Sequence, residues 1–204
     1  MARIDTKRVQ KNKVMILTNG EHSEKNYFEL LKSKLHTYYS INVKFENADP
    51  LGLVEKAIVI SPEYNRVWCV FDVDDFQTHD KVRKAVRLAQ SSENINIACS
   101  NRAFEVWLLN HYHAFRSKAT TRQLDQFMAS LLFEINSSLT SYDKTNVAIL
   151  KNHFVPKCET AMLNAKKMHQ TLIRDTSSLR SDGAPPSIWE LKPLQRCTGF
   201  LNFY

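Results

Sequence analysis

The fold is decided by one stretch of the sequence, VWCVFDVDDFQTHD at residues 67–80. Its first half is continuously apolar, as a strand of a parallel sheet covered on both faces should be. The run then ends in Asp72, Asp74 and Asp75. Aspartates in this place are either turn and capping residues or ligands of a metal ion. We therefore predict a central strand over residues 66–74 whose end carries a group of carboxylates.

Strands and helices alternate around this stretch. The other predicted strands are short runs rich in β-branched residues, at 13–18, 41–47 and 95–100. The predicted helices have apolar side chains at helical spacing, at 23–35, 49–60, 80–90 and 102–115. Ser23 is expected to cap the first helix, and Asp49 and Pro50 to begin the second. This alternation predicts an α/β fold with a mostly parallel central sheet between helices.

From residue 116 onward the apolar spacing is helical only. The helical stretches are 121–135, 142–152 and 157–173. A polar loop is expected at 175–187, and a last short helix follows it. We expect an α/β core of residues 1–115 and a C-terminal helical extension of residues 116–204 that packs on this core as one compact unit.

Composition restricts the class of protein. The chain has 204 residues, of which 43% are hydrophobic, which is enough for one compact domain with a sizeable core. Its four cysteines are far apart and lack CxxC spacing, so free thiols are expected in place of a zinc site or disulfides. No apolar run reaches the roughly 18 residues that a membrane span needs. These features predict a soluble cytoplasmic protein that has no membrane partner.

The formal net charge is +7, and the lysines and arginines are spread over several segments. Such a balance favours a basic face that binds the phosphates of RNA or DNA. A lysine-rich, solvated helical surface explains the same charge, so both interpretations stay open at this point.

Polar residues follow three of the predicted strands. They are Glu21, Glu24, Asp72, Asp74, Ser100, Asn101 and Glu105. The carboxyl ends of parallel strands meet at one edge of the sheet, where ligands of such folds bind. Asp72 and Asp74 share one face of their strand, and Mg²⁺ or Mn²⁺ prefers such oxygen ligands. Alternatively, the acids complement helix dipoles, and Ser100 caps a helix that starts at Arg102.

Several motifs resemble those of the RloB-like proteins in order and spacing. They are ILTNGEHSEKNYFELL, VWCVFDVDDF and ACSNRAFEVWLLNHY, and more weakly PKCETAMLNAK and PPSIWELKPL. The motifs extend from about residue 13 to residue 194. The resemblance implies a Toprim-like core, a fold that carries metal-dependent phosphodiester chemistry in primases, topoisomerases and nucleases. It also implies an antiphage effector of abortive infection, associated with restriction loci.

The resemblance implies roles for individual residues. The catalytic residues would be Glu21, Glu24, Asp72, Asp74 and Glu105, supported by Asn19, Ser100, Asn101 and Lys157. If the site is active, Glu24, Asp72 and Asp74 would hold one or two Mg²⁺ or Mn²⁺ ions, and a lysine such as Lys157 would neutralise charge on the phosphate.

Lys25 and Arg102 stand where the family pattern has prolines, and a third departure bears on catalysis. Asn19 stands where these proteins have a glutamate before the glycine of the first turn. Its amide oxygen can bind a metal but cannot exchange a proton near neutral pH, so Glu21 is the nearest replacement for the base. Two functions are therefore open: a metal-dependent nuclease acting on RNA or DNA, and a catalytically weakened sensor or partner-binding protein of a defence system.

Overall fold

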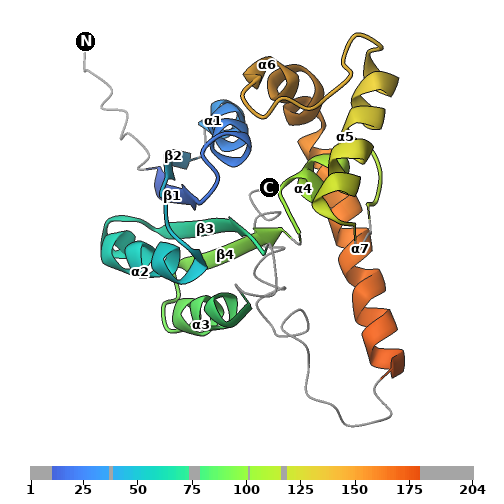
Figure 1. Ribbon diagram of the computed structural model, residues 1–204. Helices are drawn as coiled ribbons and strands as arrows, with labels where there is room; N and C mark the ends of the chain where they lie inside the picture. The colour runs from blue at the N-terminus through green and yellow to red at the C-terminus, as the bar shows by residue number, and fades with distance from the viewer. Residues whose placement is uncertain (1–10, 37–38, 74–78, 101, 116–118, 180–204) are drawn as a thin grey trace, which may run out of the picture.

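A four-stranded, all-parallel sheet forms the centre of the molecule (Figure 1). The computed structural model describes residues 11–36, 39–73, 79–100, 102–115 and 119–179. The strands are β1 (Asn12–Thr18), β2 (Tyr39–Phe45), β3 (Arg66–Asp72) and β4 (Ile95–Ser100). Their order in the sheet is β2-β1-β3-β4. The predicted α/β class is thereby confirmed.

The strand β3 is internal, as expected, and pairs with β1 on one side and β4 on the other. All of its residues from Val67 to Phe71 are buried, and the strand ends at Asp72. The predicted strand continued to residue 74, but Asp74 and Asp75 lie outside the described residues.

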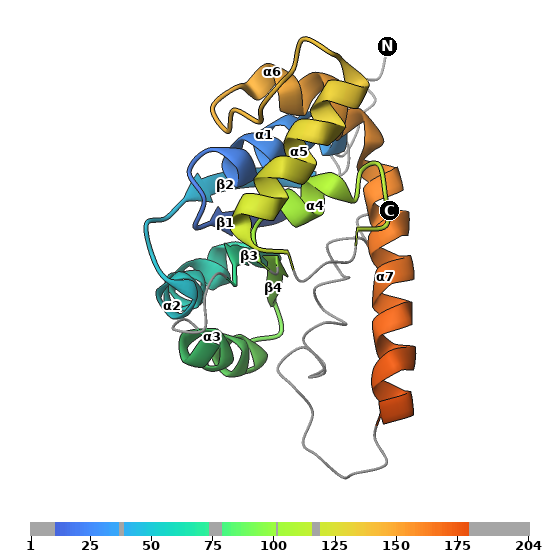
Figure 2. The ribbon, with the colours of Figure 1, turned by 45° about the vertical axis from the view of Figure 1, so that its right-hand side comes forward.

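Helices cover both faces of the sheet. The helices of the described residues are α1 (Ser23–Leu35), α2 (Pro50–Ile60), α3 (His79–Gln90), α4 (Glu105–Leu109), α5 (Thr121–Ile135), α6 (Val147–Ile149) and α7 (Cys158–Leu179). Figure 2 shows α1, α4 and α5 above the sheet and α2 and α3 below it. A short 3₁₀ turn (Ser61–Glu63) follows α2, and a π-helical turn (Leu150–Phe154) and a 3₁₀ turn (Val155–Lys157) join α6 to α7. Within the described residues no helix is both long and apolar enough to cross a membrane.

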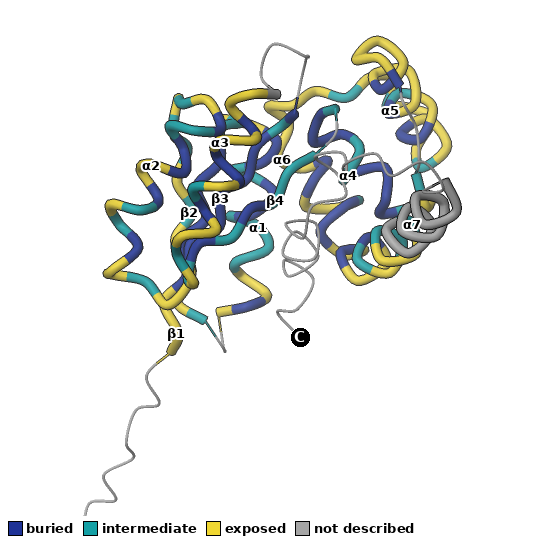
Figure 3. Tube along the Cα trace, turned by 90° about the horizontal axis from the view of Figure 1, so that it is seen from below, coloured by how far each residue is buried: buried dark blue, intermediate teal, exposed yellow. Residues whose placement is uncertain are grey.

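The two helical layers give the protein two apolar cores. Successive side chains of a strand point to opposite faces, so Val14 and Ile16 enter the core below α1 while Met15 and Leu17 enter the core with α2 and α3. The buried backbone between the layers is dark blue in Figure 3. Helices of the second half, such as α5 through Leu124 and Met128, belong to the first of these cores. The expected boundary between residues 115 and 116 stays a prediction.

The start of α2 confirms one predicted cap, and the start of α1 corrects another. The Asp49 side chain accepts a hydrogen bond of 3.0 Å from the backbone N–H of Gly52, and Pro50 is the first helical residue. In α1 the N-cap residue is His22, which makes no capping bond with its side chain. Ser23 is already helical, and its hydroxyl is hydrogen-bonded instead to Tyr142 (2.9 Å).

The predicted helix over residues 102–115 is wrong in length, since α4 covers Glu105–Leu109 only. Asn110 ends it: the Asn110 amide donates to the Val106 carbonyl (2.7 Å) and its oxygen accepts from the backbone N–H of Phe115 (3.2 Å). Such local bonds compete with helix hydrogen bonds. Ser100 therefore cannot cap a helix starting at Arg102.

Two further boundaries differ from the predictions in the helical half. In the stretch 142–152 the helix begins only at Val147. Before it, the Asp143 side chain accepts a hydrogen bond from the backbone N–H of Thr145 (2.8 Å), which forms a turn. The Asn146 side chain then caps α6 by accepting from the backbone N–H of Ala148 (3.1 Å). The long helix α7 continues to Leu179, so the polar loop cannot begin at residue 175. The expected last helix lies outside the described residues.

The cysteines of the described residues are free, as expected. Cys69 and Cys158 are buried, Cys99 is half-buried, and Cys197 is not among the described residues. Burial raises the pKa of the Cys69 thiol to about 12, so this side chain behaves as a small apolar group of the β3 core.

A buried histidine joins three helical segments above the sheet. His111 Nδ1 lies 3.0 Å from the Trp107 carbonyl, which can only accept, and Nε2 lies 2.9 Å from the Tyr27 hydroxyl. The ring also contacts Phe154 edge to face, with centroids 5.6 Å apart. These partners fix a neutral imidazole that donates from Nδ1 and accepts at Nε2. Burial lowers the pKa of His111 to about 4.

The low pKa of His111 predicts a loss of stability in acid. An unfolded histidine binds a proton near pH 6.5, whereas the folded His111 resists protonation down to about pH 4, so stability falls as the pH drops between these values. Because of His111, the free energy of unfolding should decrease by about 2–3 kcal/mol from pH 7 to pH 4. Urea titrations at several pH values would measure this loss.

The matched comparison uses two glutamine variants. His111→Gln should remove this part of the pH dependence, whereas His113→Gln, at an exposed position, should keep it. If His111→Gln and wild type lose the same free energy in acid, His111 is not the responsible group.

Candidate functional site

The carboxyl ends of β1, β3 and β4 meet at one edge of the sheet. Asp72 at the end of β3 pairs in register with Ser100 at the end of β4. The backbone N–H of Asn19, just after β1, donates to the Val70 carbonyl (3.1 Å), and that of Val73 donates to the Ser100 carbonyl (2.9 Å). We call this edge, with the turn and helix starts that follow its strands, the acidic edge.

Glu24 is the buried carboxylate on the β1 side of the acidic edge. It lies in the first turn of α1, directly after the turn of residues 19–22, and only 6% of the residue is exposed. Its carboxylate lies against Gly20, where a methyl group would overlap with the Glu24 carboxyl atoms. Gly20 is therefore needed for the close approach of the backbone to this carboxylate.

The side chain of Asp72, at the end of β3, acts on the carboxyl group of Glu24. Burial raises the pKa of Glu24, and the charge of Glu105 raises it further. The backbone N–H of Glu24, the charge of Lys144 and the side chain of Asp72 lower it in part. Burial is the largest of these effects, so the net pKa of Glu24 is raised.

Glu105, at the start of α4, is the third acid of the acidic edge. The residue is only 3% exposed, and its Oε1 lies 2.7 Å from the ammonium of Lys144. Among the described residues this oxygen has no other hydrogen-bond partner. Burial acts to lower the pKa of Lys144, but the bond to Glu105 and the charges of Glu105, Glu24 and Asp72 outweigh burial and raise it. Lys144 is therefore charged among three carboxyl groups.

Lys144 was not among the residues expected from the sequence. It lies between α5 and α6, in a polar segment about 120 residues after Glu24, and no spacing or motif marks it. A second contact joins the same segment to α1, the hydrogen bond of 2.9 Å between Tyr142 and Ser23. Burial raises the pKa of Tyr142, so its hydroxyl stays protonated. Sequence reasoning missed both residues because only the fold brings this segment to the acidic edge.

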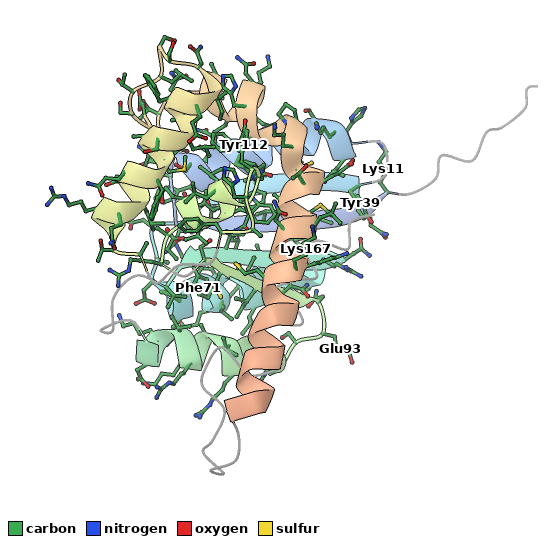
Figure 4. The ribbon with its side chains drawn as sticks, turned by 90° about the vertical axis from the view of Figure 1, so that its right-hand side faces the viewer. Lys11, Tyr39, Phe71, Glu93, Tyr112 and Lys167 are labelled. Carbon is green, nitrogen blue, oxygen red and sulfur yellow. The ribbon has the colours of Figure 1, made fainter. Side chains whose placement is uncertain are left out.

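The other residues expected from the sequence do not all lie at the acidic edge. Lys157 lies over the ring of Tyr112, with Nζ 4.2 Å from its centroid, a cation–π contact. Tyr112 is labelled in Figure 4, among the helices on the α1 side of the sheet. The lysine that contacts the carboxylates is Lys144. Glu21 is exposed and Asn19 is half-buried, both in the turn before α1. Asp74 and Asn101 lie outside the described residues.

The donor set suits a hard divalent cation in part. Glu24 and Asp72 supply carboxyl oxygens at the same edge of the sheet, and oxygen is the ligand type that such a cation prefers. Within the described residues, however, no group of three or more histidine, cysteine, aspartate or glutamate side chains is arranged so that it could hold a metal ion. Mg²⁺ is commonly bound by one or two carboxylates together with waters and substrate phosphates.

Comparison with known proteins identifies the family. The family model described as RloB-like protein matches residues 14–189. The chain belongs to the RloB-like family. No curated protein and no solved structure gives a significant match. The family match spans the whole acidic edge of this RloB-like chain, from Asn19 to Lys144, and confirms the resemblance seen in the sequence.

Gly20 allows a test of the geometry of this RloB-like chain. We expect Gly20→Ala to push the Glu24 carboxylate away from Asp72, because the added methyl group would overlap with it. Because the overlapping atoms are the end of the Glu24 side chain, we expect the low end of the about 1–3 kcal/mol of unfolding free energy that overpacking costs. In a Glu24→Ala background the same change should cost much less, and urea unfolding of the four proteins would measure the coupling.

Gly52→Ala is the matched control for this change. A methyl group there would meet its nearest neighbour, Ala48, at an ordinary 3.5 Å, and alanine favours the helix α2. It should be neutral or stabilising. Additive costs of Gly20→Ala and Glu24→Ala would show that the two positions do not touch.

Proposed function

We propose that this RloB-like protein is a metal-dependent nuclease of the Toprim type that cleaves RNA or DNA and acts as an effector of antiphage defence. One observation supports this proposal most directly: Glu24, Asp72 and Glu105, from three separate segments, gather at the carboxyl edge of a parallel sheet. Burying acids together is costly unless a cation is bound or a proton is shared. Such a cost in stability is expected mainly at functional sites.

Glu24 and Asp72 are proposed to hold Mg²⁺ or Mn²⁺, with Asp74 as a further ligand. When bound, the ion would polarise a phosphodiester and make water or a hydroxyl a better nucleophile. Burial raises the pKa of Glu24, so its charged form would be favoured by a bound cation. Glu21, exposed in the preceding turn, is proposed to take the proton of the nucleophile because Asn19 cannot.

A basic helix is proposed to hold the nucleic acid near this site. The strand β3 leads from the acidic edge into α3, whose exposed side includes Arg83, Lys84 and Arg87. Its opposite side packs Val82 and Ala85 in the core, so the basic side faces solvent. Asp80 offsets part of this charge through an ion pair of 2.8 Å with Lys84. The remaining positive charge favours phosphate contacts that weaken as salt is added.

A second function is supported by a different observation. Asn19 replaces the glutamate of the family pattern, and Lys144 already supplies positive charge to Glu105. Both features fit a catalytically weakened member that uses the acidic edge to bind a cation, a phosphate or a partner protein of a defence system. This alternative keeps cation binding at the edge and predicts no turnover.

The nuclease proposal is tested by cleavage assays on purified protein. We expect cleavage of tRNA, single-stranded DNA or duplex DNA in the presence of Mg²⁺ or Mn²⁺ and its loss with a chelator. Asp72→Asn and Glu24→Gln should each lower the rate by on the order of a hundredfold or more, because each removes a charged ligand. Glu55→Gln, at an exposed position of α2, is the control and should keep the wild-type rate.

The outcome separates the two functions. Metal-dependent cleavage that requires Asp72 supports the nuclease. Mn²⁺ binding that is lost in Asp72→Asn, without cleavage of any nucleic acid offered, supports the sensor instead. Cleavage that persists in both variants would contradict the site itself.

Asn19 provides a gain-of-function test. If catalysis is weakened by the missing base, Asn19→Glu should raise metal-dependent cleavage by roughly a hundredfold, the usual contribution of a positioned general base. Asn19→Gln gives a side chain as long as glutamate but without its carboxylate, and it should leave the rate low. If Asn19→Glu changes nothing while Glu21→Gln abolishes cleavage, Glu21 has taken over the proton transfer.

A further inference from the structure

Three exposed lysines of this protein are held by neutral partners. Most lysines that have a defined contact are paired with a carboxylate, for example Lys32 with Glu29 (3.0 Å) and Lys84 with Asp80 (2.8 Å), so much of their charge is cancelled. The three that differ, which among the described residues are not paired with any carboxylate, are Lys11, Lys34 and Lys157. We call them the lysine cluster.

Two members of the lysine cluster meet at the turn before α7. Lys34, in the last turn of α1, donates to the Val155 carbonyl (3.0 Å), and Lys157 ends the 3₁₀ turn that begins with Val155. Burial raises the pKa of the Cys158 thiol, and the nearby charge of Lys34 acts in the opposite direction. Lys157 Nζ lies 4.2 Å from the centre of the Tyr112 ring. The charges of Lys34 and Lys157 therefore lie on one part of the surface.

Lys11 brings a third ammonium group to the same end of α1. It directly precedes β1, and its ammonium donates to the carbonyl of His36, the residue after α1. Figure 4 labels Lys11 and Tyr112, and both lie in the half of the molecule that holds α1 and the start of α7. Ammonium groups from three segments are thus placed around the end of α1.

The partners of these lysines fix position without removing charge. A backbone carbonyl accepts one of the three N–H groups of an ammonium and leaves the others for a ligand. An aromatic ring attracts the ammonium but carries no net charge. The ring of Tyr112 is itself held, because its hydroxyl donates to the His153 carbonyl (2.8 Å). The lysine cluster therefore presents oriented positive charge that suits an anion.

The lysine cluster lies at the opposite edge of the sheet from the acidic edge. Helix α1 starts after the carboxyl end of β1 and ends before the first residue of β2. At about 1.5 Å per residue, Glu24 in its first turn and Lys34 in its last turn are about 15 Å apart along the helix axis. The cluster cannot touch atoms that react at the acidic edge, but a long ligand can reach both edges.

We propose that the lysine cluster binds backbone phosphates of the nucleic acid at a distance from the acidic edge, and so selects substrates that extend at least about 15 Å beyond this edge. The inference rests on the proposed nuclease function and adds a minimum length to its substrate. Phosphates follow one another about every 3.4 Å along each strand of a duplex, so this distance corresponds to about four to five base pairs. The basic side of α3 is a separate contact, because α3 lies on the other face of the sheet.

The experiment measures nucleic-acid binding without metal. Fluorescence anisotropy in the presence of a chelator compares labelled RNA and DNA hairpins with stems of about twelve and about four base pairs, so that only the longer stem spans the two edges. We expect Lys34→Gln with Lys157→Gln to weaken binding of the long hairpins by at least about tenfold and to lower the salt slope by about two. The short hairpins should bind this variant and the wild type alike.

Matched variants separate the cluster from total charge and from folding. Lys44→Gln with Lys56→Gln removes the same charge from two lysines that are paired with Glu46, and it should bind the long hairpins as the wild type does. Lys34→Arg with Lys157→Arg keeps the charge and should keep the affinity. Lys11→Gln changes a different segment and should by itself lower the salt slope by about one. Because all three lysines are exposed, the variants should keep the wild-type melting temperature.

The results also separate this inference from the proposed function. Unchanged binding in both cluster variants, or an equal loss in the Lys44 and Lys56 control, overturns the role of the lysine cluster, and metal-dependent cleavage would leave the nuclease proposal standing. No binding of any hairpin at low salt overturns it as well. If the long hairpins bind through the cluster but are not cleaved with Mg²⁺ or Mn²⁺, the nuclease proposal fails and the nucleic-acid surface remains.

Discussion

Parallel pairing of β3 with both β1 and β4 is the constraint on which the other features of this protein depend. Parallel strands end at the same edge of a sheet, so the acids that follow separate strands are brought together there. Parallel strands also need crossover connections, which place helices on both faces and bury the strands completely. Trp68 and Phe71, fully buried on opposite faces of β3, show this double coverage.

Several contacts surround the carboxyl groups of the acidic edge. Glu24 lies against Gly20 and is influenced by the side chain of Asp72, and Glu105 is paired with Lys144. Each contact comes from a different segment, and the ion pair replaces part of the solvation that Glu105 loses on burial. Burial keeps the pKa of Glu24 raised despite these contacts. The proposed bound cation would favour the charged form of this carboxyl group.

The helical second half contributes both to the core and to the acidic edge. Helix α5 and the turns before α7 cover the α1 side of the sheet through residues such as Met128 and Phe154. The same half supplies Tyr142 and Lys144, which attach to Ser23 and Glu105 of the first half. Packing of these helices therefore also completes the surroundings of the carboxylates. A change in α5 that loosened this packing would act on the edge as well as on stability.

The sequence by itself determined the α/β class, the internal place of β3 and the start of α2 at Asp49 and Pro50, because hydrophobic period and capping chemistry are local properties. It also identified the acids that follow the strands, and with them the family. Only the tertiary structure decided that Lys144 and not Lys157 meets these acids, that Ser23 bonds Tyr142 instead of capping α1, and that α4 ends at Leu109. Each of these depends on contacts between residues far apart in the chain or on competing side-chain bonds, which no local pattern records.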